Sequence, residues 1–117
     1  MRFLSIYKTA ETGEMCSAED MERMGRLVEE GMKAGWLVAV EGCLPSATGA
    51  RVRRAGDDYT VIDGPFAETK EVIGGLAILE ASSKEEALRL VKDFLQVAGD
   101  GECELRQIFE AAQHAGA

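Results

Sequence analysis

Apolar residues occur in short runs that are separated by two longer stretches with helical spacing. Runs that mix β-branched and aromatic residues predict strands, and apolar residues three or four positions apart predict amphipathic helices. The predicted strands are residues 2–8, 36–40, 76–79 and 103–109. Residues 51–54 and 59–62 flank a turn that contains Gly56, which is typical of a β-hairpin.

The two predicted helices carry recognisable start and stop signals. Ser17 is followed three residues later by Asp20, an acidic variant of the capping box, and Gly35 is a typical helix end. Ser82 and Ser83 are rival caps for the second helix, which ends at Gly99. The residues predicted to pack inward are Met21, Met24, Leu27, Val28 and Met32 in the first helix and Leu88, Val91 and Leu95 in the second.

The order of the predicted elements is β-α-β, an inserted hairpin, and then β-α-β again. This order indicates an α+β protein with the ferredoxin-like split β-α-β plan, in which two helices cover one face of an antiparallel sheet. A length of 117 residues fits a single domain over 1–117. The small-residue stretch 110–117 predicts a flexible tail.

Three of the predicted strands, 3–7, 36–40 and 76–79, are apolar on both faces. Two helices cover only one face of the sheet, so the other face would be a large apolar patch in a monomer. We therefore predict a homodimer in which two sheets pack face to face and close a barrel-like core. The alternative is that the hairpin or the tail covers the bare face.

Composition and charge narrow the class of protein. The chain is 46% hydrophobic and 29% charged, which is ordinary for a globular protein, and it has no run of about 18 apolar residues that would span a membrane. It starts with a strand-like run and not with a secretory leader, which predicts a cytoplasmic protein. A formal net charge of −8 argues against direct binding to nucleic acid.

The chain has no recognisable metal or nucleotide motif, so no cofactor is predicted. Cys16, Cys43 and Cys103 are odd in number and widely spaced, which favours buried free thiols over disulfides or a metal site. His114 is the only histidine, and it lies in the predicted tail without an orienting partner.

Asp63 is the strongest candidate for chemistry, because it follows an apolar strand and precedes Gly64 and Pro65. Pro65 fixes its own φ and biases Gly64 toward an extended backbone, so the turn is expected to hold Asp63 in place. Asp63 is a candidate general base or orienting carboxylate if partial burial raises its pKa. The alternative is an Asx turn in which its carboxylate caps nearby backbone N–H groups.

Other charged residues are candidate ligand-binding groups. Glu104 and Arg106 share one alternation face of the last strand, and Glu41 ends the second strand. Together they would bind a small polar or acidic molecule in a dimer cleft, and the alternative is a surface ion pair. Arg51 and Arg53 project on one side of the hairpin and would hold a carboxylate or a phosphate, unless they form a solvated strand face.

One nine-residue run carries a resemblance to a known family. Its letters, DGPFAETKE, resemble the signature of the DGPF group within the YCII-related proteins of bacteria. The residues of this motif are Asp63, Gly64, Pro65, Phe66, Ala67, Glu68, Thr69, Lys70 and Glu71. The resemblance continues through 72–75 and, in the order of elements, over nearly the whole chain. It implies the dimeric α+β barrel superfamily, in agreement with the hydrophobic pattern.

The resemblance has two implications for function. YCII-related proteins have been proposed as small enzymes built around a His–Asp pair, with the histidine in the first helix. By position Asp63 would take the Asp role, but no histidine precedes His114, so the other half of the pair is missing. DGPF proteins are also associated with extracytoplasmic-function sigma factors, which implies a regulatory module.

Two functions from different classes follow from the sequence. The first is a protein that binds a small polar or acidic molecule near Asp63, with or without lyase- or isomerase-type acid–base activity. The second is a non-catalytic dimeric interaction module that contacts a sigma factor or another transcription protein. Whether the protein is an enzyme stays open at this stage.

Overall fold

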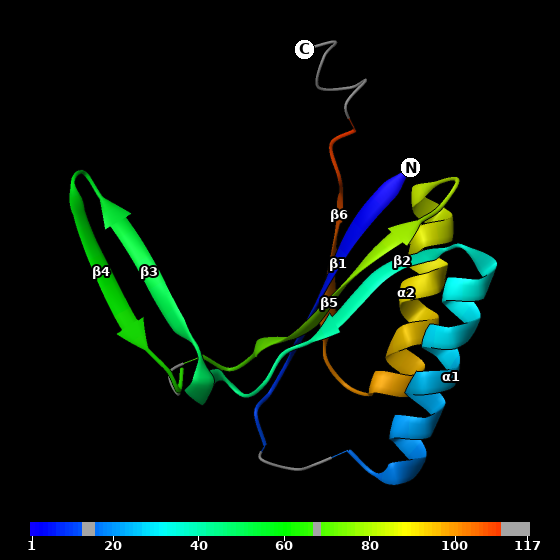
Figure 1. Cartoon of the computed structure of the whole chain (residues 1–117), viewed down its shortest axis with the longest axis horizontal. Helices are drawn as coiled ribbons and strands as arrows, with labels where there is room; N and C mark the ends of the chain where they lie inside the picture. Colours follow the sequence, from blue (N-terminus) through cyan, green and yellow to red (C-terminus); the bar gives the residue numbers. More distant parts are fainter. Residues whose placement is uncertain (13–15, 67–68, 111–117) are drawn as a thin grey trace.

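The computed structural model describes residues 1–12, 16–66 and 69–110 of the chain. Two helices and six strands follow one another in the predicted order (Figure 1). The elements are β1 Arg2–Thr9, α1 Ala18–Ala34, β2 Leu37–Gly42, the short 3-10 helix η1 Ser46–Thr48, β3 Ala50–Ala55, β4 Asp58–Asp63, β5 Val72–Glu80, α2 Lys84–Ala98 and β6 Glu102–Gln107.

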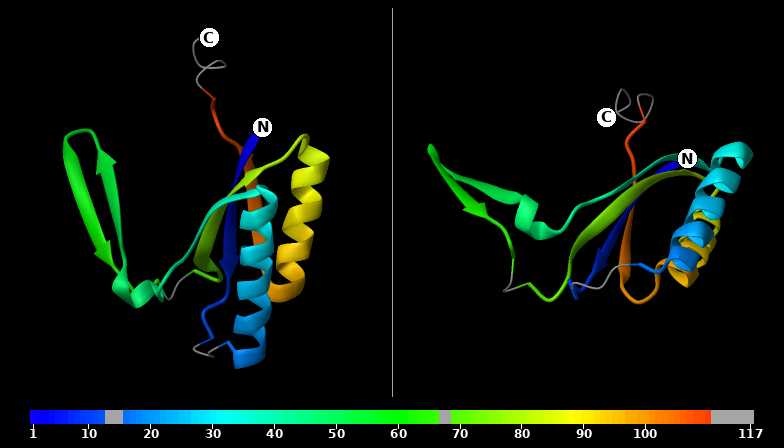
Figure 2. Two further views of the ribbon diagram at one scale, coloured as in Figure 1. Left: turned by 45° about the vertical axis from the view of Figure 1, so that its right-hand side comes forward. Right: turned by 60° about the horizontal axis from the view of Figure 1, so that its bottom comes forward.

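Four strands form an antiparallel sheet in the order β2-β5-β1-β6, and β3 and β4 form a separate hairpin. Because β5 lies between β1 and β2, and β1 lies between β5 and β6, each helix joins two strands that are not neighbours in the sheet. This is the ferredoxin-like split β-α-β plan, and the α+β prediction is confirmed. Both helices pack on the same side of the sheet (Figure 2).

The helix ends match the signals in the sequence. The Ser17 hydroxyl accepts a hydrogen bond from the Asp20 N–H, and Gly35 ends α1 in the left-handed conformation, with φ of 87°. In α2 both Ser82 and Ser83 take part in capping the N-terminus. Ser83 is the N-cap and accepts from the Glu86 N–H, while the Ser82 N–H and hydroxyl donate to the Glu86 carboxylate.

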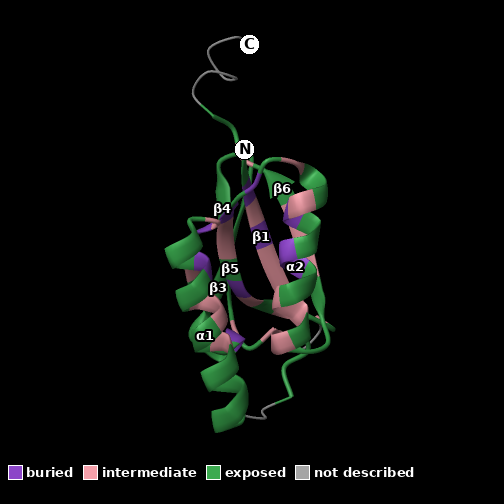
Figure 3. Ribbon diagram, turned by 90° about the vertical axis from the view of Figure 1, so that its right-hand side faces the viewer, coloured by how far each residue is buried: buried purple, intermediate pink, exposed green. Residues whose placement is uncertain are grey.

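The buried core lies between the helices and the sheet (Figure 3). Its buried hydrophobic residues are Phe3, Leu37, Leu79, Ala81, Ala87, Leu90 and Val91. The predicted inward stripes were partly wrong, because Met21, Met32 and Leu88 are exposed. In α2 the buried residues are Ala87, Leu90 and Val91. Val91 was predicted to face inward, whereas Ala87 and Leu90 take the place of Leu88.

Gly31 sets how closely α1 approaches the end of the sheet. It is the buried residue of α1, and a Cβ at this position would lie 2.7 Å from the Trp36 ring and 2.9 Å from Leu37 Cβ. The helix can therefore contact β2 only with a residue that has no side chain. The inward face of α1 consequently centres on Leu27, Val28 and Gly31, and Met32 is left exposed beside it.

The second face of the sheet carries an apolar strip that no helix covers. Cross-strand pairs place Leu4 beside Ile78 and Ile6 beside Leu76, with side chains opposite to the helix-facing residues. Leu76 is 37% exposed and the neighbouring Ile73 is 51% exposed.

The hairpin of β3 and β4 projects away from the sheet instead of folding over it (Figures 1 and 2). Every residue of both strands is exposed, including Val52, Tyr59 and Val61. The alternative that the hairpin covers the bare face is therefore wrong within one chain. The other alternative concerned the tail, and residues 111–117 lie outside the described residues.

The projecting hairpin makes the molecule flat and extended. The radius of gyration is 16.4 Å and the principal extents are 46 × 43 × 19 Å, whereas a compact domain of this length has a radius of gyration of about 13 Å. Neither helix in the described ranges is long and apolar enough to cross a membrane.

Two glycine substitutions in α1 should have opposite effects on stability. We expect Gly31→Ala to lower the free energy of unfolding by about 1–3 kcal/mol, because its Cβ collides with Trp36 and Leu37. Gly25→Ala, with no heavy atom within 4 Å of its Cβ, should raise it by about 0.5–1 kcal/mol. Urea unfolding measures both, and equal effects at the two positions would contradict this packing.

Candidate functional site

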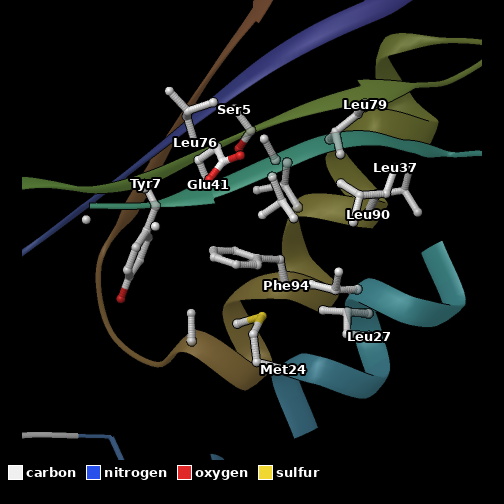
Figure 4. Close-up of a pocket in the computed structure, with 18 of the residues that line it drawn as sticks. Ser5, Tyr7, Met24, Leu27, Leu37, Glu41, Leu76, Leu79, Leu90 and Phe94 are labelled. Atoms are coloured by element: carbon white, nitrogen blue, oxygen red, sulfur yellow. The ribbon is translucent and has the colours of Figure 1, made fainter. Parts of the chain in front are cut away.

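A cavity of about 360 Å³ lies between the helices and the sheet (Figure 4). Its walls are mostly apolar and aromatic residues from β1, β2, β5, α1 and α2. Those that surround the hollow most directly are Tyr7, Met24, Leu27, Leu37, Leu90 and Phe94. A concave apolar space of this size with a few polar groups is typical of a small-molecule site.

Ser5 provides a polar group at the floor of the cavity. It lies on the central strand β1, between Ala77 of β5 and Leu105 of β6, and its side chain is only 7% exposed. Cys103, a partly buried residue of the adjacent strand β6, has its thiol pKa raised by burial, and a hydrogen bond with the Ser5 hydroxyl offsets part of that rise. A thiol is a weak hydrogen-bonding partner, so the Ser5 hydroxyl keeps capacity for a stronger one.

Tyr7 forms the wall where β1 meets the α2 end. Its ring packs edge-to-face on Phe94 at 5.4 Å between centroids, and its hydroxyl donates to the Asp100 carbonyl at 2.9 Å. The register of β1 and β5 shifts beside Tyr7, next to Gly74. A Cβ at Gly74 would lie 3.2 Å from the Tyr7 ring. The absence of a side chain at this position therefore lets the ring pack directly against the backbone of β5.

Cys16, Gly42 and Gly74 also line the cavity, at the ends of the elements that enclose it. The expectation of buried thiols was wrong for Cys16 and Cys43, which are exposed, and Cys103 is partly buried. The two exposed cysteines lie in loop segments outside the helices and the sheet, where residues are generally exposed. Cys43 is nevertheless anchored, because its N–H donates to the Gly74 carbonyl at 2.9 Å.

Hydrogen bonds around Ser46 form a brace that connects the motif turn to two other segments of the chain. The Glu11 carboxylate accepts hydrogen bonds from the Ser46 N–H at 2.6 Å and from the Ser46 hydroxyl at 2.9 Å. The Phe66 N–H in turn donates to the Ser46 hydroxyl at 3.1 Å. These bonds tie the β1–α1 connection, η1 and the motif turn together.

Gly64 brings the motif turn directly onto η1. A Cβ at Gly64 would lie 1.7 Å from the Ser46 carbonyl oxygen, which no side chain tolerates. The Gly64 N–H donates to the Gly49 carbonyl at 2.9 Å, and the Gly64–Pro65 peptide bond is cis. Because β2 and its Gly42 lead into η1, this brace fixes the loop that leaves one end of the cavity.

Arg51 belongs to the same brace. Its guanidinium lies 3.8 Å from the centroid of the Phe66 ring and donates to the Thr69 hydroxyl at 3.0 Å. Arg51 was predicted to hold an anionic ligand, and the structure places it on the motif itself. Ala67 and Glu68, which complete this part of the motif, lie outside the described residues.

Asp63 is the last residue of β4, pairs with Ala50 and is exposed. The hairpin that carries it projects from the sheet, so within one chain the carboxylate is not enclosed. Arg53, another candidate on the hairpin, is exposed and pairs with Thr60.

Glu104 and Arg106 do come together, and they lie on the bare face of the sheet. Lys8 donates to Glu104 at 3.1 Å, and Arg106 approaches the same carboxylate at 3.4 Å. The hydrogen bond between Lys8 and Glu104, with their mutual attraction, raises the pKa of Lys8 and lowers the pKa of Glu104. The three side chains form a partly exposed ion-pair cluster.

Glu41 does not join this cluster. Its strand partner is Leu76, which pairs with Ile6, which in turn pairs with Glu104. Glu41 and Glu104 therefore lie in one row at opposite edges of the sheet, about 14 Å apart across three strand spacings. The candidate residues from the sequence consequently occupy four separate places: the hairpin, the motif brace and the two opposite edges of the sheet.

Titratable side chains do not gather into a metal centre in the described ranges, where no three His, Cys, Asp or Glu side chains are placed to hold an ion. His114 lies outside those ranges. The groups that sequence reasoning missed are Ser5 and Tyr7 at the cavity and the Glu11–Ser46 pair at the brace. For Ser5 a signal existed, because it is a polar residue on the otherwise apolar alternation face of a central strand.

Comparison with known proteins places the chain in a family. The YCII-related domain matches residues 1–112, nearly the whole chain. The chain belongs to the YCII-related domain family. An uncharacterised protein of Rhizobium meliloti (strain 1021) is similar, with 35% identity over 81 residues, and the match covers 66% of this chain and 65% of that protein.

Removing the Ser46 hydroxyl should destabilise this member of the YCII-related family at the motif brace. We expect Ser46→Ala to lower the free energy of unfolding by about 1–3 kcal/mol, because Glu11 and the Phe66 N–H each lose a partner. Thr48→Ala in the same turn is the control, since its hydroxyl donates to the Pro45 carbonyl three residues earlier and not to a distant segment among the described residues. Urea unfolding measures both, and an effect of Thr48→Ala as large as that of Ser46→Ala would argue against the brace.

Proposed function

We propose that this YCII-related protein is a homodimer that binds a small molecule in the cavity between its helices and its sheet. The observation that carries the proposal is the cavity itself, about 360 Å³ in volume, with apolar and aromatic walls and the Ser5 hydroxyl at its floor. A domain that only packs its own core has no need of such a space, because protein interiors are close-packed and an empty cavity costs stability.

The surroundings of the cavity support a binding role. Two connections that leave the cavity, one through Gly42 and one through the segment that carries Glu11, meet at the Ser46 brace. Hydrogen bonds between segments far apart in the sequence hold these loops in a fixed arrangement, as a preorganised site requires. The motif thus supports the site from outside instead of lining it.

Binding is proposed in preference to catalysis. The histidine of the family's His–Asp pair has no counterpart in α1, since His114 is the only histidine. An acid–base step of lyase or isomerase type would fall to Asp63, which is exposed in one chain and would need a second copy to enclose it. Among the ligand-binding residues expected from the sequence, Glu41 alone lines the cavity, and its pairing with Leu76 turns its carboxylate toward the bare face of the sheet.

Two variants should differ in whether a bound ligand still raises the melting temperature. In a thermal-shift screen of metabolites, a hit should raise the melting temperature of the wild type and of Asp63→Ala alike. Ala98→Leu, which narrows the cavity at the end of α2, should lose most of the shift. Loss of the shift in Asp63→Ala but not in Ala98→Leu would place the ligand at the hairpin and contradict the proposal.

The bare face of the sheet supports the homodimer. Leu4, Ile6, Leu76 and Ile78 form an apolar strip in the middle of this face, and the hairpin of the same chain does not cover it. Soluble proteins rarely expose such a strip, and a second copy offers an identical one in a two-fold arrangement. The Lys8–Glu104–Arg106 cluster lies at the edge of the strip, where an interface has its polar rim.

Light scattering tests the homodimer with a matched pair of variants. Leu76 on the bare face is 37% exposed and Leu88 on α2 is 39% exposed. We expect the wild type and Leu88→Lys to have twice the chain mass of 12.6 kDa, and Leu76→Lys to have the mass of one chain. A monomeric wild type, or a dimer that survives Leu76→Lys, would overturn the proposal.

A second candidate function is the non-catalytic interaction module, favoured by the projecting hairpin. Val52 and Val61 are paired on one of its faces and are 67% and 62% exposed, beside Tyr59. An exposed apolar hairpin of this kind fits a protein partner, for which a sigma factor or another transcription protein is the proposed class. Co-purification from the native host that recovers no transcription protein would argue against this second function.

A further inference from the structure

We infer that the cavity takes an uncharged, largely apolar molecule with fused or linked rings and one hydroxyl or carbonyl group that hydrogen-bonds to Ser5. The inference rests on the proposed binding function and names the ligand class. It departs from the sequence-based expectation of a polar or acidic ligand, and the reason is the distribution of charge around the cavity.

No cationic side chain is available to an anionic ligand in the cavity. Among the described residues that line it there is no lysine or arginine, and the one carboxylate belongs to Glu41. The pairing of Glu41 with Leu76 places that carboxylate on the opposite, bare side of the sheet. The positive charges of Lys8 and Arg106 lie on that same bare side, in pairs with Glu104.

A charged group inside such a space would be buried without a partner. The free-energy cost of transferring an isolated carboxylate or ammonium ion into an apolar environment is far larger than the cost for a neutral polar group. The described cavity walls offer no cation to an anionic ligand, and their one carboxylate, Glu41, lies on the bare side of the sheet, away from a cationic one. Anionic and cationic ligands are therefore both disfavoured relative to a neutral molecule of the same shape.

The aromatic residues favour a ligand with rings. Tyr7 and Phe94 stand edge-to-face at one side of the cavity, and Trp36 lines it just before the start of β2. Met24 faces the same hollow from α1 (Figure 4), and its flexible thioether adapts to the edge of a ring. Flat apolar groups gain both area burial and favourable ring geometry among such side chains.

Ser5 is the group that would orient the ligand. The Tyr7 hydroxyl already donates its proton to the Asp100 carbonyl, so this proton is not available to a ligand. The Ser5 hydroxyl is buried at the floor, and its hydrogen-bonding neighbour is the weakly bonding thiol of Cys103. A ligand hydroxyl or carbonyl therefore finds one suitable partner, and the ligand needs only one polar group.

The test is a displacement experiment on the full-length protein with a neutral probe. N-phenyl-1-naphthylamine, which fluoresces in apolar surroundings, is bound first, and energy transfer from Trp36, the single tryptophan and a residue that lines the cavity, reports that the probe binds near it. It is then displaced by 1-naphthalenemethanol, 1-naphthoic acid or 1-naphthalenemethylamine. We expect the alcohol to displace it at a concentration at least about tenfold lower than either charged analogue.

Two variants and a control locate the effect. Ser5→Ala should weaken displacement by the alcohol about three- to tenfold and leave displacement by 1-methylnaphthalene unchanged. Ala98→Leu should weaken binding of the probe itself, because the added side chain occupies the cavity. Ala34→Leu, at the exposed end of α1, should bind as the wild type does. Far-ultraviolet circular dichroism confirms that each variant is folded.

Each outcome separates the inference from the binding proposal. If the probe does not bind, or if Ala98→Leu binds it as tightly as the wild type, the cavity is not a binding site and the proposed function fails. If the probe binds in the cavity but the acid or the amine displaces it as well as the alcohol, the ligand class is wrong while the binding site stands. An unchanged preference for the alcohol in Ser5→Ala would overturn the role of Ser5.

Discussion

The structure depends on one imbalance: a four-stranded sheet that is apolar on both faces and only two helices to cover it. Phe3 and Leu79 point toward the helices, and the residues that alternate with them, Leu4 and Ile78, point away. The hydrophobic effect requires that both faces be shielded from water. The helix-covered face supplies the core and the cavity, and the other face is where we propose a second copy to bind.

The signature motif has a mechanical role in one chain. Gly64 packs against η1 with no room for a side chain, Ser46 links Glu11 to Phe66, and Arg51 covers the Phe66 ring. These contacts hold the base of the hairpin and the loops beside the cavity. Among the described residues of this motif, the best-defined interactions are those of a brace.

Local signals predicted the elements well, because they act over a few residues. Ser17 and Gly35 define α1, and the turn at Gly56 defines the hairpin, through backbone geometry that depends on the residue type alone. The order of elements then restricts the topology, since split β-α-β connections have few alternatives. The motif letters identified the family for the same reason, as a local match.

The site was harder to predict, because it depends on contacts between distant segments. Alternation places Glu104 and Arg106 on one face, but only the strand order shows that Glu41 lies three strand spacings away. The inward face of α1 depends on the close approach at Gly31, which left Met32 exposed despite its helical spacing. A cavity is the volume that two packed layers leave empty, so no pattern in β1 alone reveals that Ser5 lies at its floor.

Native mass spectrometry of the wild-type protein with N-phenyl-1-naphthylamine tests the dimer and the cavity together. We expect particles with twice the chain mass of 12.6 kDa that carry the bound probe. Particles of a single chain without the probe would contradict this expectation, because neither apolar face of the sheet would then have the role assigned to it.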